Sequence, residues 1–157
     1  MLEGYFSRTL VAYDHVLCVH GSSMFIRKES RDRWLECIDF EDQIIELLPI
    51  GGEKVNTKTL CVTNNALEVL TLNKSGSGIK RGEQLKLPGK IISVEIGEKK
   101  WLESNIFVKT EGHQNKKDVS LWVCSPDLKP TLLMRDDSGT RLDRDSYCRF
   151  LQVSNQP

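Results

Sequence analysis

The sequence predicts an all-β fold built from about three four-stranded antiparallel units, and three observations lead to this prediction. Short apolar segments recur at an interval of about 45 residues, polar turn-forming residues separate them, and a matched triplet marks each recurrence. The 157 residues suffice for one domain with a buried core. We therefore expect a single region of repeated units over residues 1–157.

The clearest sign of the repeat is the triplet Leu17-Cys18-Val19, which returns as Leu60-Cys61-Val62 and is echoed by Ile106-Phe107-Val108. A polar turn and a second apolar segment follow each copy. In the third copy the turn has grown to Glu111–Asp118, where a hairpin tolerates an insertion. The pattern predicts that Leu17 and Leu60 occupy equivalent places in separate four-stranded sheets.

A third and a fourth segment complete each predicted unit. The third segments carry charged residues, as in Arg33–Asp39, and are expected at an exposed rim. The fourth segments are Ile44–Leu48 and Ile91–Ile96, with Tyr147–Val153 as the next equivalent. This grouping gives repeat units 12–48, 55–96 and 101–153.

The segment Ile44–Leu48 is compatible with a helix as well as a strand. Its apolar residues also satisfy helical spacing, and they follow the acidic pair Glu41-Asp42, which suits a helix start. The equivalent stretch Lys90–Ile96 is rich in β-branched residues and follows Pro88-Gly89. β-branched residues favour strands, so we predict a strand in both places.

The composition limits the possible partners and compartments. Lys and Arg number 22, as do Asp and Glu, so the formal net charge is zero and direct nucleic-acid binding is not expected. No stretch approaches the roughly 20 apolar residues of a membrane span, and the first ten residues lack a signal-peptide core. We expect no membrane insertion and a nuclear or cytoplasmic location. The five cysteines are predicted to be reduced and buried: Cys18, Cys37, Cys61, Cys124 and Cys148.

The sequence contains two arrangements that resemble ligand sites, and we expect neither of them to bind a ligand. The glycines of Gly76-Ser77-Gly78 resemble a phosphate loop, but no helix start follows them to receive a phosphate, so a hairpin loop is predicted. His15, Cys18 and His20 are close enough in sequence to suggest a metal site. On a strand, however, His15 faces away from the other two. No cofactor and no metal are predicted.

Asp14, His20 and Ser22 have the residue types of a hydrolase triad. These residues belong to one hairpin, and no nucleophile elbow surrounds the serine. The sequence therefore predicts no enzyme activity and no small-molecule substrate.

The three tryptophans, Trp34, Trp101 and Trp122, lie in or at the start of predicted strands. Large aromatic side chains usually pack in the core, and Trp122 is predicted to be buried because its strand is apolar throughout. The alternative role is that of an interface anchor, for which Trp34 and Trp101 are the candidates.

The strand order and turn positions resemble those of a WD40-like β-propeller whose Gly-His and Trp-Asp signatures have been lost; His20-Gly21 reverses the first of these. The run Leu17–Leu72, including the segment DFEDQIIELLPI, also resembles the N-terminal propeller of the large accessory subunit of the Fanconi anaemia core complex. The first resemblance implies antiparallel blades. The second implies a nuclear scaffold of a ubiquitin-ligase assembly for DNA crosslink repair, without catalytic residues of its own.

The leading expectation is thus a noncatalytic protein-interaction scaffold that binds other protein subunits, formed by about three blades of an incomplete β-propeller. Closed propellers have about 4–8 blades, so we expect a piece of a longer propeller, self-association, or completion by a partner. The alternative is a closed, pleckstrin-like β-barrel that binds peptide or lipid headgroups, with Ser146–Val153 as its helix.

Overall fold

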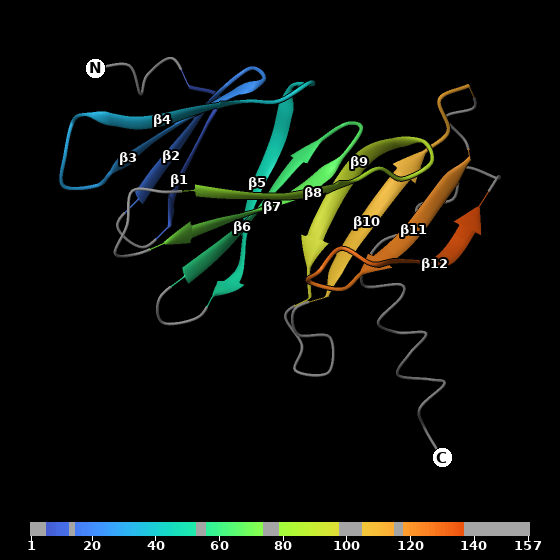
Figure 1. The fold of residues 1–157 in the computed structure, drawn as a ribbon. Coiled ribbons are helices and arrows are strands. Elements are labelled where there is room, and N and C mark those ends of the chain that lie inside the picture. The colour runs from blue at the N-terminus through green and yellow to red at the C-terminus, as the bar shows by residue number, and fades with distance from the viewer. Residues whose placement is uncertain are drawn as a thin grey trace. The chain divides into compact units, whose positions relative to one another are not determined.

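The computed structural model describes residues 6–12, 15–52, 56–73, 79–97, 105–114 and 118–136. The chain divides into two compact units, Met1–Lys86 and Leu87–Pro157. The described residues form three four-stranded sheets and contain no helix, which confirms the predicted all-β class (Figure 1). No helix among them is long and apolar enough to cross a membrane.

The first sheet follows chain order, with the strands antiparallel to their neighbours. Its strands are β1 (Arg8–Ala12), β2 (His15–His20), β3 (Ser23–Lys28) and β4 (Trp34–Asp39). Gly21, between β2 and β3, has a φ of 61°, a conformation suited to glycine in a tight hairpin. The polar turn after the first triplet thus reverses the chain, as predicted.

The second sheet repeats this arrangement. It consists of β5 (Ile44–Gly52), β6 (Asn56–Thr63), β7 (Leu67–Asn73) and β8 (Ile79–Leu85), again in chain order. At the turn between β6 and β7, the Thr63 hydroxyl accepts a hydrogen bond from the Ala66 amide at 3.0 Å. Since β5 contains Ile44–Leu48, the prediction of a strand there is confirmed and the helical alternative is wrong.

The third sheet belongs to the second unit. It consists of β9 (Lys90–Ile96), β10 (Ile106–Glu111), β11 (Val119–Cys124) and β12 (Pro130–Asp136). The lengthened turn predicted after the third triplet joins β10 to β11, and the Gly112 amide donates to the Asp118 carbonyl at 2.9 Å. All three sheets are therefore simple antiparallel meanders.

The predicted equivalence of the first two triplets is confirmed. Leu17 lies on β2 and Leu60 on β6, each the second strand of its own sheet. Cys18 and Cys61, between the apolar partners of each triplet, are both buried. The repeat in the sequence therefore corresponds to a repeat in space.

The predicted grouping of strands into units needs a correction. Ile44–Leu48 and Lys90–Ile96 do not close a unit but open the next one, because β5 pairs with β6 and β9 pairs with β10. The Ile44 amide donates to the Gly21 carbonyl at 2.9 Å as the chain passes to the second sheet. The sheets span 8–39, 44–85 and 90–136, shifted from the predicted units. Tyr147–Val153 and the alternative helix Ser146–Val153 lie outside the described residues.

The closed-barrel alternative gains no support, because the described strands form three separate sheets. The single propeller-like region over 1–157 stays a prediction.

The core of the first unit lies between its two sheets. Alternate residues of β2 and β3 share one face, since successive strand residues point to opposite sides. From that face Leu17, Val19 and Ile26 join one buried cluster with residues of the second sheet, among them Cys61 and Leu70. Each fully buried aliphatic side chain of this kind stabilises the fold by about 1.5–3 kcal/mol. The two sheets are thus held together chiefly by aliphatic packing.

Candidate protein-interaction surfaces

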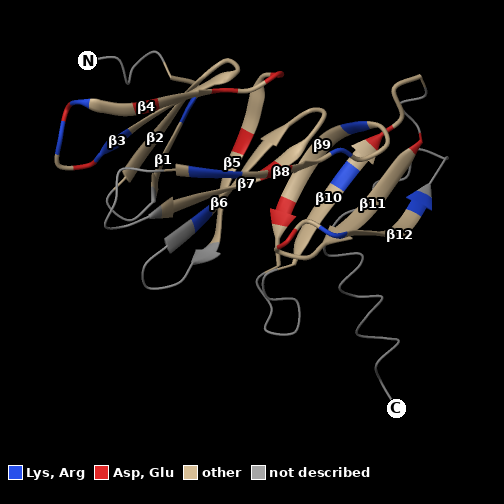
Figure 2. Ribbon diagram, in the orientation of Figure 1, with Lys and Arg blue, Asp and Glu red and all other residues tan. Residues whose placement is uncertain are grey.

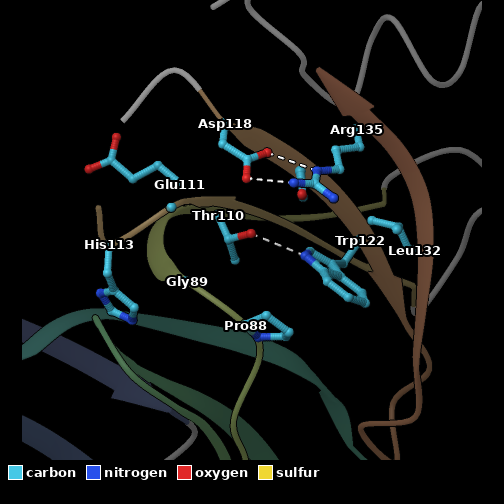
Figure 3. A pocket seen from close by; sticks show the side chains of 11 residues that line it. Pro88, Gly89, Thr110, Glu111, His113, Asp118, Trp122, Leu132 and Arg135 are labelled. Atoms are coloured by element: carbon cyan, nitrogen blue, oxygen red, sulfur yellow. Dashed lines mark hydrogen bonds and ion pairs between the residues drawn. The ribbon is translucent and has the colours of Figure 1, made fainter. Parts of the chain in front are cut away.

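A pocket of about 310 Å³ lies on one face of the third sheet (Figure 3). Its wall is formed by the turn before β9, the end of β10, the first part of β11, and β12. Its lining includes Pro88, Gly89, Thr110, Ser120, Trp122 and Leu132.

The strand register gathers these side chains. Thr110 pairs with Ser120 across β10 and β11, and Trp122 is two residues further along β11, so all three share a face. Trp122 pairs with Leu132 on β12, directly after a register shift at Leu121/Trp122. The indole N–H of Trp122 donates to the Thr110 hydroxyl at 3.1 Å, which fixes the ring against the sheet.

The rim beside Trp122 depends on a glycine. Gly89 has a φ of 90°, and a Cβ there would lie 2.5 Å from the carbonyl oxygen of Glu111. A residue with a Cβ at position 89 could not come this close to the Glu111 carbonyl unless the backbone moved. The turn cue Pro88-Gly89 therefore allows the entry to β9 to pass close to the end of β10.

Two of the charged groups that line the pocket, Asp118 and Arg135, are paired with each other. Arg135 donates from Nε and Nη2 to the two carboxylate oxygens of Asp118, at 2.9 and 2.8 Å. His113 is exposed in the loop after β10 (Figure 3). An incoming group therefore meets the indole of Trp122 and the exposed side chain of Leu132, flanked by a neutralised ion pair.

The structure corrects two expectations of burial. Trp122 is half-buried as a wall of the pocket, not fully buried. Cys37 is an exposed thiol, because β4 is an edge strand and Cys37 pairs only with Phe25 of β3. Cys18, Cys61 and Cys124 are buried and form no disulfide, as predicted, and Cys148 lies outside the described residues.

Burial also governs the chemistry of the thiols. It raises the pKa of Cys61 to about 12, with Glu68 adding to the rise and Arg81 opposing it. Burial raises the pKa of Cys124 to about 11. Both groups are therefore thiols at neutral pH and are poor nucleophiles and metal ligands.

Of the two tryptophans predicted as interface residues, Trp34 is half-buried at the start of β4 and Trp101 lies outside the described residues. The centre of the Trp34 ring lies 5.7 Å from the ring centres of both Phe6 and Phe25, and the centres of those two rings are 5.6 Å apart. This three-ring cluster lies on the face of the first sheet opposite the core.

The residues considered for catalysis and metal binding differ in burial, and part of them is not described. His15 is buried and His20 exposed, while Asp14 and Gly76-Ser77-Gly78 lie outside the described residues. In the part of the chain that the structure describes, no group of three or more His, Cys, Asp or Glu side chains could hold a metal ion.

Charges of both signs are interspersed along the strands. Figure 2 shows acidic and basic residues together on β9 and on β10, where Lys109 and Glu111 are two residues apart. This pattern is typical of a solvated surface, whereas a nucleic-acid interface needs clustered positive charge.

Comparisons with known proteins support the fold alone. No protein-family model and no curated protein matches the chain. The crystal structure of a protein from Lactobacillus plantarum is similar with a TM-score of 0.54 and 9% identity, over 83% of this chain and 41% of that one. The WD40 domain of SCAP from fission yeast is similar with a TM-score of 0.53 and 14% identity, over 78% of this chain and 32% of that one.

The chain thus spans about two fifths and one third of the lengths of these two structures. Together with the three four-stranded meanders, the likeness shows a propeller-like, WD40-like fold of incomplete extent.

Proposed function

We propose that the chain is a noncatalytic protein-interaction module that works as a scaffold for other protein subunits. The observation that carries the proposal is the pocket of the third sheet, where half-buried Trp122 and exposed Leu132 are paired across two strands. Aromatic anchors in pockets with a polar rim are typical of the residues that dominate binding between proteins. The WD40 domain among the structural neighbours supports the same class of function.

The chemistry of the pocket favours an apolar side chain of a protein partner. Its ion pair is already formed between Asp118 and Arg135, and its indole N–H is satisfied by Thr110. This ion pair therefore offers no unpaired charge to a charged substrate, and the other acidic lining residue is Glu111. The volume of about 310 Å³ is at the lower end of the range for small-molecule sites and suits one large side chain.

The test is affinity purification of the tagged chain from cells, with the Leu132→Asp variant beside the wild type. A charge at position 132 places an uncompensated group in the apolar part of the pocket, so we expect the partner proteins to be reduced about tenfold or more, which corresponds to 1.4 kcal/mol. Thr131→Asp is the matched control, since Thr131 is exposed on the same strand and does not line the pocket. Equal recovery of partners by both variants, with both folded by circular dichroism, would contradict the proposal.

We propose further that the partners belong to a nuclear, Fanconi-type ubiquitin-ligase assembly for DNA crosslink repair. The support is the resemblance of Leu17–Leu72 to a propeller of that complex. Co-precipitation from nuclear extract should recover core-complex subunits, and imaging of the tagged chain should find it in the nucleus. If the partners are cytoplasmic proteins of another assembly, the interaction function stands and this assignment is wrong.

Trp34 and Trp101 are retained as proposed interface residues, apart from the pocket. Direct contact with nucleic acid is not part of the proposal, because the net charge is zero.

A further inference from the structure

The pocket of the third sheet has an apolar end and a polar end. Trp122 and Leu132, paired across β11 and β12, form the apolar end. Ser120 lies two residues before Trp122 on β11 and therefore shares its face of the sheet. The partners of Ser120 on the adjacent strands are Thr110 and Arg135. A group that fills the pocket thus meets apolar carbon at one end and side-chain oxygen at the other.

The two hydroxyl groups at the polar end have unused hydrogen-bonding capacity. Thr110 accepts the indole N–H of Trp122 at 3.1 Å, and among the described residues its own hydroxyl proton has no acceptor. Thr110 is 2% exposed and lines the pocket, so an acceptor can approach it from there. The hydroxyl of half-buried Ser120 makes no hydrogen bond within the same described residues. Because an unpaired buried hydroxyl is unfavourable, an occupant that covers both groups must supply hydrogen-bonding atoms to them.

The charged residues of the lining offer no counter-ion beside the two hydroxyls. Asp118 and Arg135 hold each other through two hydrogen bonds. Glu111 follows Thr110 on β10, so its side chain leaves the opposite side of the strand. Figure 3 shows its carboxylate, like the ring of His113, on the side of the pocket opposite the indole. These groups therefore favour an uncharged occupant.

We infer that the pocket binds a tyrosine side chain of the partner protein, with its ring against Trp122 and Leu132 and its phenol oxygen at Ser120 and Thr110. Directly paired residues have Cβ atoms about 4.5–5.5 Å apart, so one oxygen atom can lie within hydrogen-bond distance of both hydroxyls. The phenol oxygen accepts from Thr110 while its O–H donates to Ser120. This inference rests on the proposed function and names the side chain that the pocket selects.

Other large side chains match the two ends less well. Phenylalanine, leucine and methionine would cover the hydroxyls without a partner for them, and tryptophan has a donor but no acceptor for Thr110. A lysine or arginine would bring a cation next to Arg135, and a carboxylate would come next to Asp118. Asparagine and glutamine satisfy the hydroxyls but leave the apolar end without a matching surface. A tyrosine ring is uncharged and apolar with one polar tip, as the pocket requires.

Two small probes that differ only in the phenol oxygen test the inference. N-acetyltyrosinamide and N-acetylphenylalaninamide are titrated separately into the full chain, and binding is followed by the NMR signal of the Trp122 indole N–H. The loss of that signal in Trp122→Phe assigns it. We expect the tyrosine probe to bind at least about fivefold more tightly, which is the effect of one additional hydrogen bond.

Ser120→Ala and Ser93→Ala are the matched variants, and circular dichroism checks that both are folded. Ser120→Ala should weaken binding of the tyrosine probe about fivefold and leave the phenylalanine probe unchanged, because only the hydroxyl is removed. Ser93→Ala should change neither affinity, since Ser93 is exposed on β9 and does not line the pocket. Equal affinity of the wild type for the two probes, no shift of the indole signal, or an undiminished tyrosine affinity in Ser120→Ala would overturn the inference.

The proposed function is judged separately, by the partners that Leu132→Asp recovers from cells. In the same purification, Ser120→Ala should reduce the partners about fivefold. Partners that are lost with Leu132→Asp, from a chain that does not prefer the tyrosine probe, would refute the tyrosine assignment and support the interaction function. Partners that are kept with Leu132→Asp would refute the proposed function, whatever the probes show.

Discussion

The carboxylate of Glu68, 3% exposed, is held by Arg81, whose Nε and Nη2 donate to its two oxygens at 2.8 and 3.0 Å. Gln84 donates a third hydrogen bond to the same carboxylate at 3.3 Å. Because Arg81 also bonds the Asp39 carbonyl, this pair links the second sheet to the chain leaving the first. The hydrogen bond to Glu68 is also the main cause of the raised pKa of Arg81.

We predict that Arg81→Met destabilises the fold by about 1–3 kcal/mol, because it leaves the buried Glu68 carboxylate without its cation. The double variant Glu68→Met/Arg81→Met should recover most of this loss, since an apolar pair needs no compensation. Urea unfolding followed by circular dichroism measures all three proteins. Additive losses in the double variant would show that the two side chains do not act as a pair.

The hydrogen bond between Trp122 and Thr110 should have a measurable free energy. Thr110→Val keeps the shape of the side chain but removes the acceptor for the indole N–H, and we expect a loss of about 1 kcal/mol in the free energy of unfolding. Thr131→Val, at an exposed position of β12, should change it by less than about 0.5 kcal/mol. Similar values for the two variants would mean that the bond does not hold the pocket.

Two glycines with positive φ allow a matched test of the rim. Gly89→Ala should destabilise the protein more than Gly21→Ala, because a Cβ at position 89 meets the Glu111 carbonyl at 2.5 Å whereas nothing lies within 4 Å at position 21. Gly21→Ala should cost only the conformational strain, about 1–2 kcal/mol. Thermal melting ranks the two variants, and the reverse order would contradict the close approach of β9 and β10.

Stability should fall in alkaline solution through the buried thiols. The pKa of Cys61 rises from 9.0 to about 12 on folding, so its contribution to stability is complete below about pH 9 and is lost as the pH approaches 12. Cys61→Ala should therefore lose stability less steeply than the wild type over that range, whatever its stability at neutral pH. Cys37→Ala serves as the control, since burial and Asp39 raise the pKa of this exposed thiol much less. Parallel pH profiles for all three proteins would contradict the burial of Cys61.

Much of the fold could be read from the sequence, because each strand carries a local signal. β-branched residues and turn cues identified Ile44–Leu48 as a strand, and the repeated triplet placed Leu17 and Leu60 in equivalent positions. The sheet to which a strand belongs is not local information. An apolar strand fits either neighbouring sheet, and so the sequence pattern puts Ile44–Leu48 at the end of one unit, whereas in the structure it opens the next.

The candidate surfaces could be predicted less well. An apolar strand indicated burial for Trp122, but its exposure depends on the pairing with Leu132 and on the register shift beside it, which no local pattern shows. Thr110 and Ser120, polar residues within apolar strands, were the available signal for the pocket. Residue type alone suggested Trp34 as an interface residue. Its place on the face of the first sheet opposite the core requires the register of β2, β3 and β4.

The central claim is that this propeller-like chain acts by binding other proteins. The most direct test is the native mass of the full chain isolated gently from cells, measured by light scattering with mass spectrometry of the components. The account predicts an assembly that contains the chain and at least one other protein in a fixed ratio. A folded monomer with no co-purifying protein would contradict it.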